Sequence, residues 1–244
     1  MTVVLFRQHG LRVAEFWFGQ PAGEVRRVDL ILRRREPLPT PKWSCTPFDT
    51  LHTDLGQPEG TMFAAIQETV RYEIRRGQSR DGLEFECWAA PPSAIVDEFL
   101  GRYRAFAREK GLAPLRPDPL PAYASAGLLH LTTATINGET IVWHAYTAGS
   151  TWVNLIRSVS LFRSATSSSD RQLTGRANKA LHWFDMLHYK SAGVVLYDWG
   201  GWYTGGKDRE KLLINQFKAS FGGSLVHTFD SVAPASTRGA LYLW

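Results

Sequence analysis

Cysteine is scarce in this chain. Cys45 and Cys87 are the only cysteines among 244 residues, and they do not stand in a C-x-x-C spacing. Two such residues supply neither the ligand pattern of a structural zinc site nor the framework of a disulfide-stabilised fold. The fold must therefore rest on a hydrophobic core. A chain of this length with 44% hydrophobic residues can bury one, as one large domain or two small ones.

The chain also lacks a long apolar segment. No window approaches eighteen consecutive apolar residues, and the stretch from Met1 to Gly19 has no charged region followed by a long apolar run. We therefore expect neither a signal peptide nor a membrane span, and we predict a cytoplasmic protein.

Three common catalytic signatures are missing as well. The sequence has no G-x-S-x-G nucleophile elbow, no P-loop and no G-x-G-x-x-G dinucleotide fingerprint. Their absence argues against an α/β-hydrolase, a P-loop nucleotide hydrolase and a Rossmann-type dehydrogenase.

Positive charge, in contrast, is in excess. The formal net charge is +5, and much of the excess lies early in the chain, at Arg26, Arg27, Arg33, Arg34, Arg35 and Lys42. A basic surface attracts anions such as CoA, nucleotide-linked sugars, RNA or anionic lipid. A solvated basic edge without a partner is the alternative. The nine tryptophans suit either a flat ligand or ordinary core packing.

A proline-rich stretch divides the predicted elements into two regions. Before it we expect strands within Val3 to Leu32, a loop from Pro37 to Pro47, a helix from Thr61 to Arg76, a strand from Leu83 to Ala89 and a helix from Ser93 to Lys110. Pro114 to Pro121 resembles a linker. We therefore predict an N-terminal α/β unit over residues 1–121, on the acceptor side, and a C-terminal catalytic unit over residues 122–244.

The second region begins with an antiparallel meander. Strands are expected at Gly127 to Thr135, Thr140 to Thr147 and Trp152 to Phe162, and Asn137-Gly138 is a strong hairpin signal between the first two. After a polar loop from Ser164 to Arg171 we predict a helix from Gly175 to Lys190, a strand from Val194 to Tyr197, a helix from Lys207 to Ser220, and strands from Ser224 to Phe229 and Gly239 to Leu243.

A short motif stands where the meander meets the next predicted helix. Gln172, Gly175 and Ala177 have the form Q-x-x-G-x-A. The small residues would let backbone amides approach a pyrophosphate at the helix start, and Arg171 and Arg176 would add charged contacts. A plain helix start with a tight turn is the alternative.

This arrangement resembles the GNAT superfamily, in which a loop of this form holds the CoA pyrophosphate. Three later segments narrow the resemblance to Fem-type acyltransferases: Tyr197 to Gly201, Ile214 to Lys218 and Phe221 to Gly223. The earlier Asp54 to Gln57 and Thr69 to Arg76 are similar to that group too. The resemblance covers roughly residues 45–230. It implies an α+β, GNAT-like fold, with a mostly antiparallel mixed sheet flanked by helices and a reduced N-terminal GNAT-like unit.

The resemblance also implies an N-acyltransferase with a co-substrate and no permanently bound cofactor. Acyl-CoA is the first donor to expect, because the chain keeps a pyrophosphate motif; classical Fem enzymes lack a good one and use aminoacyl-tRNA. The partners expected are a donor and a small-molecule acceptor, an amine on a metabolite or nucleotide sugar. Transfer RNA is an alternative partner, and DNA is not expected. A non-catalytic GNAT-fold module that binds a nucleotide or a protein is the remaining hypothesis.

Direct attack of an amine on a thioester needs a base, a charge-stabilising donor and an acid. His144 lies mid-strand and is a candidate base, with Tyr146 as acid or orienter, if Val142, His144 and Tyr146 share a face and that face is the cleft. Asp198, at the end of a buried strand, is a candidate for amine binding or base, and Tyr203 for protonating the thiolate. Core hydrogen bonding and capping are the alternatives for these residues.

The acceptor would be contacted from the predicted basic helix and the signature strand. Arg71, Tyr72, Arg75, Arg76 and Trp199 are the candidates, although a solvated helix end explains the arginines equally well. No metal is expected, because His182, Asp185 and His188 on one helix lack an i, i+4 histidine pair.

Overall fold

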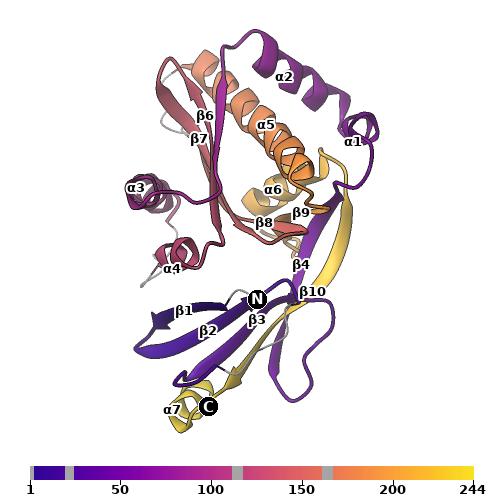
Figure 1. Ribbon diagram of the computed structural model, residues 1–244. Helices are drawn as coiled ribbons and strands as arrows, with labels where there is room; N and C mark the ends of the chain where they lie inside the picture. Colours follow the sequence, from indigo (N-terminus) through magenta and orange to yellow (C-terminus); the bar gives the residue numbers. More distant parts are fainter. Residues whose placement is uncertain (1–2, 20–24, 112–117, 161–166) are drawn as a thin grey trace. The chain divides into compact units, whose positions relative to one another are not determined.

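The computed structural model describes residues 3–19, 25–111, 118–160 and 167–244 (Figure 1). Most of the predicted proline-rich linker, the end of the third meander strand and the start of the following polar loop lie outside these residues. The chain forms two compact units: unit 1 contains Met1–Thr50, Pro92–Leu129 and Val226–Trp244, and unit 2 contains Leu51–Pro91 and His130–Leu225. The boundary predicted after residue 121 falls inside unit 1.

Unit 1 is built on strands that pair across long sequence distances. Its elements are β1 (Val3–Gln8), β2 (Leu11–Trp17), β3 (Leu30–Glu36), α3 (Ser93–Glu109), α4 (Leu120–Ser125), α7 (Thr237–Leu243) and most of β10 (Ser224–Pro234) and of β4 (Ser44–Asp54). β1 and β2 form an antiparallel hairpin through His9 and Gly10, which both have positive φ. β2 pairs with β3 in parallel, and β3 pairs with β10 antiparallel.

Unit 2 is a sheet with helices on one face. Its elements are α1 (Glu59–Ala65), α2 (Glu68–Ser79), β5 (Glu84–Trp88), β6 (Leu129–Ile136), β7 (Glu139–Ala148), β8 (Trp152–Ser160), α5 (Ser168–Ser191), β9 (Leu196–Gly201) and α6 (Arg209–Ala219). The strands are ordered β4-β9-β8-β7-β6-β5. The long helix α5 lies along the sheet and α2 packs against α5 (Figure 1).

The predicted meander is confirmed. Asn137 and Gly138 both have positive φ, 51° and 77°, as the predicted two-residue hairpin turn requires. β7 and β8 pair antiparallel with a bulge opposite the Ala145–Tyr146 step. β8 pairs with β9 in parallel over Trp152–Asn154 and Leu196–Asp198, so the sheet of unit 2 is mixed, as expected.

One predicted helix is two. The apolar spacing from Thr61 to Arg76 predicts a continuous helix, but α1 ends at Ala65 and Ile66 is extended, with φ −73° and ψ 140°. That conformation directs the Ile66 side chain into the core, where it is 2% exposed. The exposed end of α1 is then capped from the next helix, because Arg71 donates hydrogen bonds to the carbonyls of Ala64 and Ile66 at 2.8 and 3.0 Å.

The prediction of a last strand at Gly239–Leu243 is wrong, because this segment is the helix α7. The Ser236 hydroxyl accepts a hydrogen bond from the Gly239 N–H at 3.1 Å, the contact of a helix N-cap. The position also demands glycine, since a Cβ there would stand 1.9 Å from the Asp29 carbonyl oxygen. The predicted strand Ser224–Phe229, in turn, runs on to Pro234 as β10.

The Asp29 carboxylate stabilises the folded state, and this stabilisation is lost at acid pH. The Arg12 backbone N–H and the Ser236 hydroxyl each donate to its carboxylate at 2.8 Å and lower its pKa from 3.8 to about 2. A depressed carboxyl pKa stabilises the folded state above the unfolded pKa, and the stabilisation is lost as pH falls from about 4 to about 2. We expect wild type to exceed Asp29→Asn in urea midpoint at pH 6 and this gap to close across that window. A gap that stays constant with pH would contradict the assignment.

Candidate functional site

The strands of unit 2 present two chemically different faces. Side chains alternate along a strand, so neighbouring residues of β7 point to opposite sides. Tyr146 joins the core cluster under α5, together with Tyr197 from β9. The residue that follows each tyrosine, Thr147 on β7 and Asp198 on β9, therefore points to the opposite face. Each face carries its own group of polar side chains.

The face under α5 holds a buried network centred on Asp185. Its Oδ2 lies 2.7 Å from His144 Nδ1 and accepts a hydrogen bond from the Tyr146 hydroxyl at 2.5 Å. Tyr146 and Tyr197 hydroxyls are 2.7 Å apart, and the Tyr197 hydroxyl is 2.9 Å from His182 Nδ1. These five side chains are at most 1% exposed. His144 and Tyr146 therefore share a face, and that face lies in the buried core under α5.

Burial shifts the pKa values of the groups in this network. Loss of water and the nearby Asp185 charge raise the pKa values of Tyr146 and Tyr197 well above the usual range. Burial and the charges of His144 and Lys218 lower the pKa of His182. The second ring nitrogen of His144, Nε2, is 2.9 Å from Asn178 Oδ1, so both nitrogens have protein partners. The catalytic roles of His144 and Tyr146 remain predictions, whereas their part in the core is plain.

The same cluster contains ligand types that metals use. Ligand atoms of His144, His182 and Asp185 lie within 4.8 Å of one another. The spacing of residues along one helix could not predict this group, because His144 is on a strand. The two imidazole rings stack with centroids 4.0 Å apart and planes inclined by 29°. Their in-plane lone pairs therefore run side by side instead of converging on one point, as ligands to one ion must. The stacking favours a hydrogen-bonded core over a metal centre.

The opposite face carries a polar row that crosses four strands. Asp198 on β9 is the register partner of Asn154 on β8, which is in turn the partner of Thr147 on β7. His52 on β4 extends the row, with its Nε2 3.4 Å from Asp198 Oδ2. Asp198, Asn154 and Thr147 are fully buried. No sequence motif points to His52, because the pairing of β4 with β9 is not visible in the sequence.

Charged groups gather where β9 ends. The Asp198 carboxylate accepts a hydrogen bond from the Gly200 N–H at 2.8 Å. The ammonium of Lys218, on α6, donates to the carbonyls of Gly200 and Gly201 at 3.2 and 2.6 Å. Burial lowers the pKa of Lys218 to about 8, against the opposing effect of the Asp198 charge. The predicted site residue Asp198 thus has a lysine beside it to which the sequence analysis assigned no role.

The Q-x-x-G-x-A motif does not form a loop at a helix start. α5 begins at Ser168, capped by the Ser167 hydroxyl, so Gly175 lies about two turns inside the helix. Ala177 packs in the core, and Arg176 forms a two-bond ion pair with Asp81 at 2.6 and 3.1 Å. Gln172 and Arg171 are exposed on the first turns. The predicted helix start near Gly175 is therefore corrected, and the anion-binding roles stay predictions.

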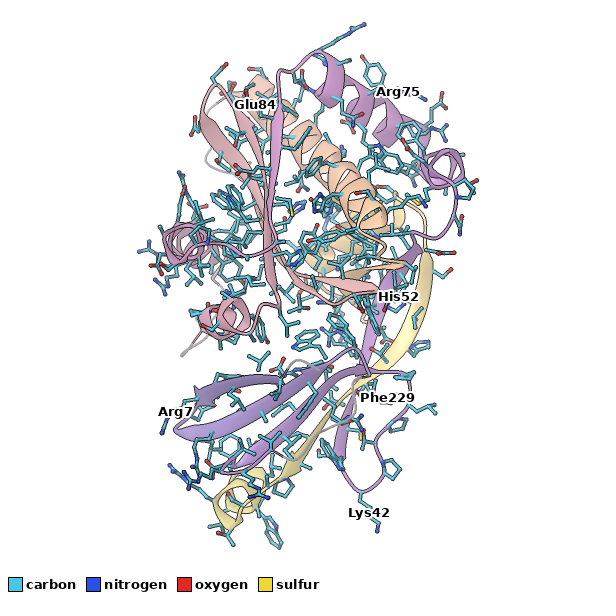
Figure 2. All side chains as sticks on the ribbon, in the orientation of Figure 1. Arg7, Lys42, His52, Arg75, Glu84 and Phe229 are labelled. Atoms are coloured by element: carbon cyan, nitrogen blue, oxygen red, sulfur yellow. The ribbon has the colours of Figure 1, made fainter. Side chains whose placement is uncertain are left out.

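The predicted acceptor residues are dispersed. Arg71 caps α1, Arg75 lies with its guanidinium 4.9 Å from the Phe63 ring centre, and Arg76 is 3.7 Å from Asp81 (Figure 2 labels Arg75 on α2). Tyr72 is 58% exposed. Trp199 is buried on the α5 side, where its indole N–H donates to the Thr53 hydroxyl at 3.0 Å. Their substrate-binding roles remain predictions.

Tyr203, the predicted acid for the leaving group, follows β9 in a loop. Its hydroxyl accepts a hydrogen bond from the Asp208 N–H at 3.3 Å, and its backbone is held by the Asn215 side chain. The Lys211 ammonium lies 5.2 Å from the ring centre. These contacts order the loop before α6, and the proton-donor role of Tyr203 stays a prediction.

Three solved structures with a similar fold are compared with this chain. FemX has a TM-score of 0.59 at 12% identity, covering 80% of this chain and 63% of the FemX chain. The C-terminal domain (DUF2156) of a protein described as a lysylphosphatidylglycerol synthetase from Agrobacterium fabrum has 0.57 at 15%, covering 99% and 83%. L-PGS from Bacillus licheniformis has 0.54 at 11%, covering 99% and 83%.

The chain shares its fold with these three proteins. The predicted fold class is confirmed, with a mixed sheet and flanking helices. No protein-family model matches the sequence, and no curated protein is significantly similar to it. The chain spans less than two thirds of FemX. At such identities the likeness establishes the fold, and activity has to be argued from the site.

Among the described residues, no helix has both the length and the apolar character that crossing a bilayer requires.

Removing the Tyr146 hydroxyl tests the buried network. Tyr146→Phe leaves the buried Asp185 carboxylate without its shortest donor, which should lower the free energy of unfolding by about 1–3 kcal/mol. Tyr72→Phe removes the same group from an exposed ring and should change it by less than about 0.5 kcal/mol. Urea unfolding of the three proteins at pH 7 provides the comparison. Equal stability of the two variants would show that the network contributes nothing.

Proposed function

We propose that this chain is an acyltransferase that moves an acyl group from an activated donor to an amine by direct attack. The observation that carries the proposal is the group of charges at the end of β9. Buried Asp198 and buried Lys218 interact there beside two glycines, in a fold that FemX and the lysylphosphatidylglycerol synthetase domain also have. Buried charges are costly, and a fold rarely retains them without a function or a complete set of partners.

The two charges suit the two ends of the reaction. An amine acceptor is an ammonium ion at neutral pH, and the Asp198 carboxylate would bind it and favour its position. When the neutral amine attacks the carbonyl carbon, negative charge develops on the carbonyl oxygen. The Lys218 ammonium would stabilise that charge, and because its pKa is about 8 it can also protonate the departing group. A C–N bond forms, and the C–S bond of a thioester or the C–O bond of an ester breaks.

The donor has two candidates. Acyl-CoA is the first expectation, on the grounds of the Q-x-x-G-x-A motif. In the folded chain the Ser167 hydroxyl accepts the Asp170 N–H at the start of α5, and Asp170 places a negative charge in its first turn. An anionic pyrophosphate would be repelled there. This observation favours the second candidate, the aminoacyl ester of a tRNA, which is bound through other contacts.

Substituting the two charged groups tests the proposed chemistry. Asp198→Asn and Lys218→Met should each lower the rate of acyl transfer by about 10²–10³-fold, because each removes one electrostatic contribution to the transition state. Lys211→Met is the matched control, since Lys211 lies on the same helix with 59% of its side chain exposed. Its rate should match that of wild type. Transfer would be measured with acetyl-CoA and with lysyl-tRNA over a panel of amines.

The measured rates distinguish the catalytic assignment from a non-catalytic binding module. Unchanged rates in both Asp198→Asn and Lys218→Met would remove the catalytic assignment. Absence of transfer from either donor to any amine would favour a non-catalytic binding module.

A thermal-unfolding experiment separates the two donors. A ligand present at one hundred times its Kd stabilises the folded state by about 2.7 kcal/mol, so millimolar CoA should raise the Tm measurably if the chain binds it. We expect uncharged tRNA, at low ionic strength, to bind in a filter assay and CoA to leave the Tm unchanged. A clear rise in Tm with CoA and no retention of tRNA would reverse the donor assignment.

A further inference from the structure

His52 stands on the polar face of unit 2 beside the predicted site residue Asp198. It lies on β4, where its neighbours Leu51 and Thr53 are buried on the α5 side of the strand. The side chain of His52 therefore points to the opposite face, toward Asp198 on β9 and Trp152 on β8. Nothing in the core network of α5 uses it. Its imidazole offers the polar row a nitrogen base, the group most often used for general acid–base catalysis.

The His52 ring is held at one edge. Its Nε2 is buried and lies 3.4 Å from Asp198 Oδ2, and the Trp152 ring meets it edge-on with centroids 5.4 Å apart and planes inclined by 77°. The side chain is still 12% exposed, and this exposure belongs to atoms other than Nε2. At 3.4 Å the two atoms face each other without a hydrogen bond in this structure. A carboxylate that faces one nitrogen while another part of the ring stays accessible is the arrangement from which an acid–base histidine works once the pair closes.

The backbone of His52 is fixed by the segment that follows Lys218. Gly223, just beyond α6, has a φ of +101°, and a Cβ at this position would stand 2.6 Å from the His52 carbonyl oxygen. Gly223 thus lets the chain after α6 pass directly against β4. The three elements that carry His52, Asp198 and Lys218 are therefore packed together within one unit.

We propose that His52 is the base that takes the proton from the acceptor ammonium, with Asp198 as the residue that orients it. This inference rests on the proposed acyl transfer and names the missing proton acceptor in it. The neutral imidazole accepts one proton from the ammonium, and the freed lone pair of the amine forms the C–N bond. The Asp198 charge stabilises the imidazolium. The departing sulfur or oxygen takes a proton from Lys218, the nitrogen of the new amide gives its second proton to the neutral Lys218 amine, and the imidazolium returns its proton to water.

Two acceptors that differ in protonation provide the test. Methylamine is almost wholly an ammonium ion at pH 7 and needs a base, whereas hydroxylamine is largely unprotonated there and does not. His52→Gln should lower kcat for methylamine by about 10²–10⁴-fold, the usual contribution of a positioned base, and leave hydroxylamine transfer nearly unchanged. Acetyl-CoA and lysyl-tRNA would be used in parallel, with hydroxamate and amide formation as the readouts.

His227 offers a matched control. It also pairs with a carboxylate, Asp49, but it lies in unit 1 with 74% of its side chain exposed. His227→Gln should act as wild type on both acceptors. If His52→Gln fails to fold by thermal unfolding, His52→Ala replaces it, and free imidazole should restore methylamine transfer.

Each outcome decides between the claims. Equal loss on both acceptors, or no loss on either, overturns the role of His52 while leaving the acyltransferase proposal intact. Failure of imidazole to restore transfer in a folded His52→Ala also overturns it. No product from wild type with either donor and either acceptor defeats the acyltransferase proposal and this inference with it.

Discussion

The carboxylate of Asp185 couples α5 to the strands beneath it. It is fully buried, and a buried charge is tolerated only when hydrogen bonds replace the lost water. The hydroxyl of Tyr146 and the ring of His144 supply these bonds from β7, and Tyr197 joins them to β9. Because the three partners belong to two strands and the carboxylate to a helix, satisfying it fixes helix and strands in one arrangement. Because Tyr197 directly precedes Asp198, this network also helps to position the end of β9.

The alternation of side chains along β7 and β9 places the core network on one face of the sheet and the candidate site on the other. Tyr146 and Tyr197 build the core on one face, and their immediate neighbours Thr147 and Asp198 form part of the polar row on the other. A rigid network behind the sheet is thereby joined, through two strands, to the polar groups in front of it. Such backing holds side chains within narrow limits, which acid–base chemistry requires.

Local signals predicted the elements well and their contacts poorly. The Asn137-Gly138 hairpin and the strands on either side could be identified because a turn and its alternation are encoded within a few residues. The start of α5 was misplaced because Gly175 suggested a boundary that the Ser167 cap places earlier. His144 was chosen as base because it lies mid-strand in the expected sheet. His52 could not be found, because its partner Asp198 approaches only through the pairing of distant strands.

The interleaving of the two units has a consequence for synthesis on the ribosome. β3 pairs with β10, from Leu30 with Pro234 to Glu36 with Phe229, so the first strands of unit 1 must wait until β10 has been made. Their apolar surfaces, Val13 and Leu30 among them, stay uncovered during translation. Closure of such distant pairs is slow, and exposed strand edges invite association with other nascent chains. Expression yield and dependence on chaperones should therefore depend on when β10 leaves the ribosome.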